Sequence, residues 1–317
     1  MRALHESQTP GDLGGLRSAQ SAIDGMSSAR SGGRMSDCSR RPKRVFVFSG
    51  GGSRGAAQVG MLRALLSAGI SPDAIAAGSV GALNAVAFAA EPTEAGVEAL
   101  AARWSTVRSG DVARTRVFDM ARNLLLRRPH LGSSAPLGEM ARLWTSVTRL
   151  EELALPVRIV TTCLDTGRAA YHDSGDLASL VRASAAIPGL FEPIELPHPV
   201  TGKPTMHVDA GLSELIPLQA AAGLDPTRVY VLDVSKRPTY TRLSNPLQVV
   251  AASCGAAVHS QPLYQLPAQV IVTHITCDPS LDSGGILDFK HTSELMDSGE
   301  HAVSAALTSE TCGTLAS

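Results

Sequence analysis

Aromatic and charged residues are scarce in this sequence. Aromatic residues make up 4% of the 317 residues and charged residues 18%, whereas hydrophobic residues make up 44%. We therefore expect a core of small aliphatic side chains, in a chain long enough to form one large domain. The formal net charge is −1, without the basic surplus that nucleic-acid-binding proteins normally carry. We expect no nucleic-acid partner.

The cysteines are few, and their spacing matches no metal-binding pattern. They are odd in number and widely separated, at Cys38, Cys163, Cys254, Cys277 and Cys312, with no C-x-x-C pair and no cluster with histidine. Metal sites need such clusters at ligand spacing. The sequence therefore predicts a reducing compartment and no bound metal.

The sequence also lacks a long apolar run. One uncharged and largely apolar run, Ala74–Ala90, is shorter than a usual membrane span and contains Gly78, Ser79, Gly81 and Asn84. We interpret it as a buried strand followed by a helix. The N-terminus has no apolar core of the signal-peptide type. The prediction is a cytoplasmic protein that is at most peripheral at membranes.

Composition divides the chain into a tail and one domain. Residues 1–43 are rich in Ser, Arg and Gly and show no apolar periodicity, so they cannot offset the entropy lost on ordering. We predict a disordered tail over residues 1–43, a domain over residues 44–310 and a short C-terminal tail over residues 311–317.

Within the domain, short β-branched runs alternate with helical patterns. Strands are expected at Val45–Phe48, Ala74–Ala77, Val157–Cys163, Val229–Val234 and Val270–Thr276, and helices at Ala56–Ala68 and Ala82–Ala90. The last three runs are apolar on both faces, as in strands that helices cover on both sides. The predicted fold class is α/β: a three-layer α/β/α sandwich with a mostly parallel central sheet. The more polar segment Val97–Leu150 is expected to be a helical insertion, a lid or access channel over one end of the sheet.

The segment Ser49-Gly-Gly-Gly-Ser-Arg-Gly55 follows the first apolar run and leads into an amphipathic stretch. It predicts a strand, a glycine loop and the start of a helix. Glycine permits positive φ and close approach of backbone N–H groups to a ligand, while a helix N-terminus adds unpaired donors. The loop is therefore a candidate binding site for a negative charge.

A second motif, Ala77-Gly78-Ser79-Val80-Gly81, lies where a short strand meets a helix. A serine between small residues at such a turn is typical of a nucleophile elbow, in which the tight backbone exposes the hydroxyl. The alternative is an ordinary helix N-cap serine. From these five residues alone, both interpretations stay open.

A third motif spans His207–Pro217 and contains Asp209-Ala210-Gly211. It places an aspartate at a strand end, at the carboxyl edge of the sheet where open α/β folds bind their ligands. Alone it is a weak signal, because strand-end aspartates often only cap the next turn.

Together these motifs resemble the patatin-like phospholipase family of serine lipid acyl hydrolases. The resemblance extends over roughly residues 45–307 and includes Arg182-Ala-Ser-Ala-Ala-Ile-Pro-Gly-Leu-Phe191. It implies that Ser79 is the nucleophile and that Asp209 is the base of a Ser-Asp dyad. It also implies that the loop of Gly50, Gly51, Gly52, Ser53, Arg54 and Gly55 forms the oxyanion hole.

Three positions depart from the family pattern. Ala77 replaces the first glycine of the elbow, Ala210 replaces the glycine after the dyad aspartate, and Leu215 stands where many relatives have asparagine. The first two changes are small for small and keep the reacting groups. The third predicts the loss of a hydrogen bond that normally steadies the Asp209 loop.

A dyad without histidine requires a carboxylate whose proton affinity is raised by partial burial. Much of the barrier is then lowered by the oxyanion hole. We expect its main donors to be the backbone N–H groups of Gly51, Gly52 and Ser53, with Val80 as a further donor. For Arg54 we favour a structural role in fixing the loop over a direct grip on a phosphate group.

Three other functions compete with a Ser-Asp hydrolase. A Ser-His-Asp triad would need a histidine from a separate loop, but His207 lies two residues before Asp209, and the late histidines have no local signature. A dinucleotide site would need an acidic residue at the end of the second strand, whereas Asp73 precedes that strand. A third alternative is a binding module of the same fold that has lost activity.

The resemblance predicts lipid or ester substrates and an acyl-enzyme intermediate, with no metal or organic cofactor required. Such substrates lie at or near membranes, so transient contact with a membrane surface is expected. The residues carry no code for a head group.

Overall fold

The computed structural model describes residues 43–112, 125–126, 130–237, 243–244, 246–278 and 284–314. The tail expected over residues 1–43 lies outside the described residues except for Lys43. The last helix, α10, runs from Thr292 to Thr314 and so extends past residue 310, the expected end of the domain.

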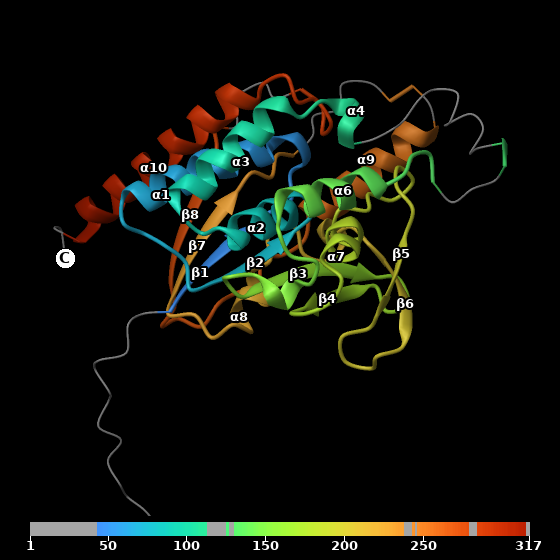
Figure 1. Cartoon of the computed structure of the whole chain (residues 1–317), viewed down its shortest axis with the longest axis horizontal. Helices are drawn as coiled ribbons and strands as arrows, with labels where there is room; N and C mark the ends of the chain where they lie inside the picture. Colours follow the sequence, from blue (N-terminus) through green and yellow to red (C-terminus); the bar gives the residue numbers. More distant parts are fainter. Residues whose placement is uncertain are drawn as a thin grey trace, which may run out of the picture. The chain divides into compact units, whose positions relative to one another are not determined.

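The described strands form one mixed sheet in the order β5-β6-β3-β2-β1-β7-β8, with β4 paired to β3 off this path (Figure 1). The strands are β1 (Arg44–Phe48), β2 (Ala74–Gly78), β3 (Val157–Cys163), β4 (Arg168–His172), β5 (Ile194–Pro197), β6 (Pro204–Val208), β7 (Arg228–Asp233) and β8 (Ile271–Thr276). From β3 through β2, β1 and β7 to β8 all pairings are parallel. The pairings of β3 with β4 and β6, and of β5 with β6, are antiparallel.

Alternating side chains of β1 face two separate cores. Phe46 and Phe48 belong to a large cluster with the helices on one face of the sheet. Val45 and Val47 belong to a smaller cluster on the other face, with residues of α8 (Leu218–Ala222). The period of two in a strand separates the two sets, so the sheet is covered on both faces. This confirms the predicted three-layer α/β fold.

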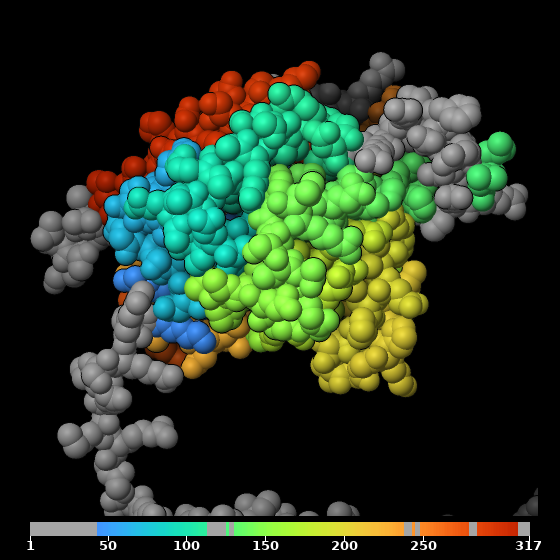
Figure 2. Space-filling view, viewed as in Figure 1, coloured from blue at the N-terminus to red at the C-terminus, as the bar shows by residue number. Residues whose placement is uncertain are grey.

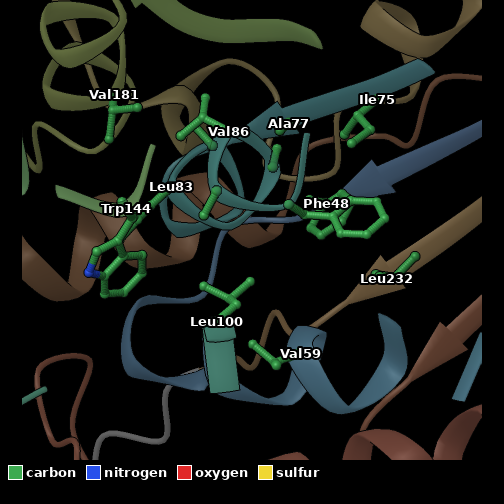
Figure 3. Packing of buried hydrophobic residues seen from close by; sticks show 14 of the residues in the cluster. Phe48, Val59, Ile75, Ala77, Leu83, Val86, Leu100, Trp144, Val181 and Leu232 are labelled. Carbon is green, nitrogen blue, oxygen red and sulfur yellow. The ribbon is translucent and has the colours of Figure 1, made fainter. Parts of the chain in front are cut away.

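The larger cluster is built around α2 (Val80–Ala90). In Figure 3, Leu83 and Val86 of this helix lie among Leu100, Trp144 and Val181, which come from three other helices. Those helices are α3 (Glu94–Thr106), α6 (Ala135–Trp144) and α7 (Leu177–Ser184), while α1 (Ala56–Ser67) packs against α3 and α10. Helices α3, α6 and α10 cover this face in Figure 2. The remaining helices are α4 (Ser109–Val112), α9 (Pro246–His259) and the 3-10 turns η1 (Gly52–Gly55), η2 (Leu150–Glu152) and η3 (Ala210–Leu212).

The predicted strands and helices agree with the structure to within two residues at each end. The predicted burial of β8 does not agree. This strand lies at the edge of the sheet, and Ile271 and Val272 are exposed. The expectation that it is covered on both faces was wrong: the buried residues Thr273 and Ile275 lie on one face, and α10 packs against this strand, whereas the alternate residues are exposed.

The expected insertion over Val97–Leu150 was also wrong for its first part. Helix α3 packs against α1 and α2, and its Leu100 and Trp104 are buried in the main core. Residues 113–124 and 127–129 of the expected lid lie outside the described residues. The uncharged run Ala74–Ala90 forms β2 and α2, as predicted. None of the helices described is both long and apolar enough to cross a bilayer.

Candidate active site

Ser79 and Asp209 are joined by a hydrogen bond across the sheet edge. The Ser79 hydroxyl donates to Asp209 Oδ2 at 2.7 Å, although the two residues are 130 positions apart in the sequence. Ser79 is partly exposed, whereas Asp209 is buried, with 8% of its surface exposed. Ser79 is therefore in contact with solvent, while the carboxylate is largely shielded from water.

The pairing of β3 explains why these two residues meet. Strand β2 runs parallel to β3 and ends opposite Val160, whereas β6 runs antiparallel to β3 and ends opposite Thr162. Strand β4 occupies the other edge of β3 along residues 159–163. The strands β2 and β6 therefore share one edge and point toward each other. Ser79 and Asp209, the residues that follow them, lie in the gap between their ends.

The backbone of Ser79 is strained, as expected for a nucleophile elbow. Its φ of 55° and ψ of −129° place a non-glycine residue at positive φ, directly before α2. Such conformations persist only where the surroundings enforce them. Ser184 supplies part of that enforcement, because its Oγ accepts the Ser79 N–H at 2.9 Å and donates to the Val160 carbonyl at 2.6 Å.

The environment of Asp209 raises its proton affinity. Burial raises the pKa of Asp209 to about 6, although hydrogen bonds from the Ser79 hydroxyl and the Gly211 N–H favour the carboxylate and oppose that rise. The Gly211 bond, to Oδ1, is 2.7 Å long. One carboxylate oxygen is therefore held by the backbone while the other faces the serine, so at neutral pH the group is an oriented base.

Other side chains steady the loop that carries Asp209. Gln261 Nε2 donates to the carbonyls of Gly211 and Leu212 at 3.0 and 2.6 Å. The Thr162 hydroxyl donates to the Asp209 carbonyl at 2.8 Å. These bonds hold the Asp209 loop even though Leu215 has no side-chain group that could donate or accept a hydrogen bond there.

The glycine loop lies beside Ser79, and some of its backbone N–H groups are already hydrogen-bonded within the protein. A Cβ built on Gly50 would lie 3.2 Å from Ser79 Cβ. The N–H groups of Gly50 and Ser53 donate to the carbonyls of Leu215 and Ile286, at 3.0 and 2.8 Å. Both groups are therefore already engaged, so Ser53 does not offer its expected backbone donor.

The remaining expected donors are open. Within the described part of the chain, the N–H groups of Gly51 and Gly52 have no acceptor, and neither has that of Val80 at the start of α2. Gly51 and Gly52 are partly exposed, and Gly52 has a φ of 60°. Unpaired amides beside a hydroxyl are suited to bind a developing oxyanion.

Arg54 is buried at the base of the loop. Its Nε donates to the Val234 carbonyl at 2.9 Å, and its side chain interacts electrostatically with Asp233 and Cys277. Burial lowers the pKa of this guanidinium, and the two neighbouring groups oppose that effect. The contact ties the loop to the end of β7, in keeping with the structural role favoured above.

Both alanine departures are accommodated without displacing the dyad. Ala77 is fully buried in the main core. Ala210 Cβ lies against Gly78, where an added Cβ would approach it to 2.9 Å. Gly78 thus provides the space that the methyl group of Ala210 occupies. Gly81 is equally tight, since a Cβ there would meet the Phe48 carbonyl at 2.5 Å.

The competing interpretations find no matching geometry among the described residues. The ring nitrogens of His207 contact Thr161 and Thr205, and no described histidine is hydrogen-bonded to Ser79 or Asp209. Asp73, the acidic residue considered for a dinucleotide site, precedes β2 and accepts the Arg44 N–H at 2.8 Å. Across the described ranges, no cluster of three or more potential metal ligands is present.

The contributions of Ser184 and Gln261 were not predicted from the sequence. Ser184 lies within the quoted Arg182–Phe191 motif, but the motif alone does not indicate that its hydroxyl contacts the Ser79 backbone. Gln261 follows α9 and has no local signature. Both roles depend on contacts between distant segments.

The fold and site define an α/β protein with a serine and an aspartate paired at the carboxyl edge of its sheet. The family model described as patatin-like phospholipase matches residues 46–222, more than half of the chain. The chain therefore belongs to the patatin-like phospholipase family.

Curated relatives match over part of their length. Patatin-like phospholipase domain-containing protein 7 of Rattus norvegicus is 29% identical over 193 residues, which are 61% of this chain and 14% of the relative. Neuropathy target esterase sws of Drosophila melanogaster is 27% identical over 192 residues, 61% of this chain and 13% of the relative. Lysophospholipase nte1 of Aspergillus terreus is 28% identical over 192 residues, which are 60% of this chain and 12% of the relative. The matched region is thus a small fraction of each of these proteins.

Solved structures show a more distant likeness. Human GIVD cytosolic phospholipase A2, in complex with methyl gamma-linolenyl fluorophosphonate, has a TM-score of 0.46 at 13% identity, covering 84% of this chain and 60% of that one. The ExoU-SpcU complex of Pseudomonas aeruginosa has a TM-score of 0.44 at 16% identity, covering 85% and 52%.

Proposed function

We propose that this protein hydrolyses carboxylic ester bonds of lipids through an acyl-enzyme formed on Ser79. The observation that carries the proposal is the 2.7 Å hydrogen bond from the Ser79 hydroxyl to Asp209, beside amides that have no acceptor among the described residues. A related protein named lysophospholipase and others named as phospholipase or esterase support the lipid class of substrate.

In the first half-reaction, Ser79 Oγ attacks the ester carbonyl while its proton passes to Asp209 Oδ2. The carbonyl oxygen becomes an oxyanion, which the open N–H groups of Gly51, Gly52 and Val80 are placed to bind. The tetrahedral intermediate then collapses. Its bond to the alcohol breaks, and Asp209 returns the proton to the leaving alkoxide.

In the second half-reaction, water attacks the acyl-serine and gives a proton to Asp209. A second tetrahedral intermediate expels Ser79 Oγ, which takes the proton back, and the fatty acid leaves. Every proton transfer uses the same carboxylate, and the water consumed supplies the second nucleophile. The raised pKa of Asp209, about 6, supports this double role, because a base works best with a pKa near the operating pH.

The test is hydrolysis of short p-nitrophenyl esters and of a lipid panel, with product detection by mass spectrometry. The parent protein is expected to release fatty acid, whereas Ser79→Ala and Asp209→Asn lose the activity. If both variants hydrolyse the esters as fast as the parent protein, the proposed dyad is wrong. Loss of activity in one His→Ala variant that still folds would favour a triad instead.

A binding module of the same fold is the second possible outcome. A fluorophosphonate probe distinguishes it, because the probe reacts covalently with an activated serine. Labelling of folded parent protein but not of Ser79→Ala supports the enzyme. Absence of labelling on folded parent protein would favour the binding module.

A further inference from the structure

Behind the glycine loop lies a chain of buried polar side chains that the proposed reaction does not use. Trp104 Nε1 donates to Asn84 Oδ1 at 2.7 Å, and Asn84 Nδ2 donates to Gln58 Oε1 at 2.9 Å. The three residues come from α3, α2 and α1 and are at most 1% exposed. They form a polar connection through an otherwise apolar core.

The two amide side chains hold both ends of the glycine loop. Gln58 Nε2 donates to the carbonyl of Ser49, where the loop begins, at 3.0 Å, and to that of Leu232 at 3.1 Å. Asn84 Nδ2 donates to the carbonyl of Gly55, where the loop ends, at 2.8 Å. The loop is therefore tied to α1 at its start and to α2 at its end, and through Leu232 its start is also tied to β7.

The network is fully satisfied, and this fixes its orientation. Both N–H groups of Gln58 and both of Asn84 have acceptors, and each side-chain oxygen accepts one bond. Rotating the Asn84 amide by half a turn would place its NH₂ against the Trp104 N–H and leave the Gly55 carbonyl without this donor. A buried network in this state specifies a single arrangement of the groups it joins.

We propose that Gln58 and Asn84 are positioning residues that fix the glycine loop, and hence its open amides, in position relative to the Ser79 hydroxyl. Asn84 lies on the helix that begins directly after Ser79, so its bond to the Gly55 carbonyl joins the nucleophile helix to the loop. The inference rests on the proposed function, since the position of the loop amides affects the rate only if they must bind an oxyanion formed at Ser79. Small displacements of such donors reduce rates steeply.

The test compares Gln58→Met and Asn84→Leu with the parent protein. Both variants keep similar side-chain volume but remove the donors to the loop. Ser134→Ala is the control, because it also removes a fully buried hydrogen-bonding group, here a hydroxyl whose partner Glu192 lies 3.0 Å away and is not part of the site. Trp104→Phe is a further variant, which removes the bond to Asn84 Oδ1 and part of the buried ring but leaves both donors to the loop in place.

Kinetics are measured per active site, with sites counted by complete labelling with a fluorophosphonate probe. For Gln58→Met and Asn84→Leu we expect kcat to fall by about 10- to 100-fold with KM nearly unchanged. The pH profile should keep its midpoint, because the surroundings of Asp209 are unaltered. Ser134→Ala should keep the parent kcat per site, even where its melting temperature falls.

A structural role alone predicts a different pattern. If melting temperatures fall but kcat per labelled site stays at the parent value, the positioning proposal is overturned. If neither variant folds, Trp104→Phe decides in the same way, with a smaller expected loss in kcat.

Amide hydrogen exchange separates this proposal from the proposed function. In either variant, peptides that contain residues 49–55 should exchange faster than in the parent protein, while peptides from β3 are unchanged. If the parent protein proves inactive, the proposed function fails, and hydrogen exchange alone tests whether Gln58 and Asn84 hold the loop. Unaltered exchange of residues 49–55 in both variants would refute the positioning proposal.

Discussion

The backbone N–H of Ser79 donates to Ser184 Oγ at 2.9 Å, which joins the nucleophile elbow to the end of α7. The Ser184 hydroxyl in turn donates to the Val160 carbonyl of β3. A single fully buried hydroxyl therefore holds the strained residue against the strand that also positions Asp209.

Replacing Ser184 should consequently affect both stability and rate. Ser184→Ala leaves the Ser79 N–H without its acceptor, which we expect to cost about 1–3 kcal/mol of unfolding free energy. We also expect a lower kcat, because the elbow is held less firmly. Chemical denaturation and ester hydrolysis measure the two effects. Ser179→Ala, on the outer side of the same helix, is the control and should retain full activity.

The strain at Ser79 predicts an unusual order of stabilities. Ser79→Gly should be more stable than Ser79→Ala by about 1 kcal/mol, because glycine adopts positive φ without the steric cost that a Cβ imposes. Both variants lack the hydroxyl and should be inactive. Thermal unfolding of the two proteins side by side tests this order, and equal melting temperatures would mean that the elbow stores no strain.

Activity should depend on the protonation state of Asp209. The carboxylate form is the base, and its pKa is raised to about 6 by burial, so kcat/KM should increase as pH rises through about 6 and then level off. Initial rates on a neutral ester between pH 4 and 9 test the profile. A midpoint near 4 would mean that the carboxylate is well solvated in solution.

The same carboxylate should make the parent protein less stable than Asp209→Asn above pH 6. Because its pKa is higher in the folded state than the ordinary 3.8, protonation favours folding, and that contribution is lost as pH rises from about 4 through about 6. Asparagine has no charge to desolvate, so it should be the more stable variant at pH 8, by on the order of 3 kcal/mol. The difference should vanish below pH 4. Urea unfolding at the two pH values measures it, and a parent protein that is the more stable at pH 8 would contradict the burial argument.

Gly51 should tolerate no side chain. A Cβ there would lie 2.7 Å from the Val234 carbonyl oxygen, so Gly51→Ala must displace the loop and its open amides. We expect kcat to fall by about 10²-fold, the loss seen when one oxyanion donor is removed. Gly69→Ala is the control, because it introduces strain at a φ of 71° but nothing lies within 4 Å of its added Cβ. It should be less stable yet fully active per folded molecule.

Much of the fold was predictable because it follows from local apolar patterns. The runs in β1, β2, β3 and β7 are short, mostly apolar and largely buried, and the helices α1 and α2 begin directly after small residues, Gly55 and Ser79. The antiparallel strands β4 and β5 were not predicted, and β6 was expected only as the strand that ends before Asp209. They are short, and their pairing partners lie far away or across turns that have no apolar periodicity.

The candidate site residues could be predicted from the sequence because each motif consists of adjacent residues. The glycine loop, the Ser79 elbow and the turn at Asp209 are each encoded by a few adjacent residues whose backbone geometry depends on their own small side chains. Their order along the chain, and their resemblance to one family, linked them in a single hypothesis.

Only the tertiary structure decided how these motifs meet. Ser79 and Asp209 are 130 residues apart, and they touch because β2 and the antiparallel β6 end head to head on one edge of β3. Which loop amides stay open was likewise decided by distant carbonyls, those of Leu215 and Ile286. Local sequence sets the conformation of a turn, whereas the partner of a hydrogen bond is set by which strands and loops the folded chain brings together.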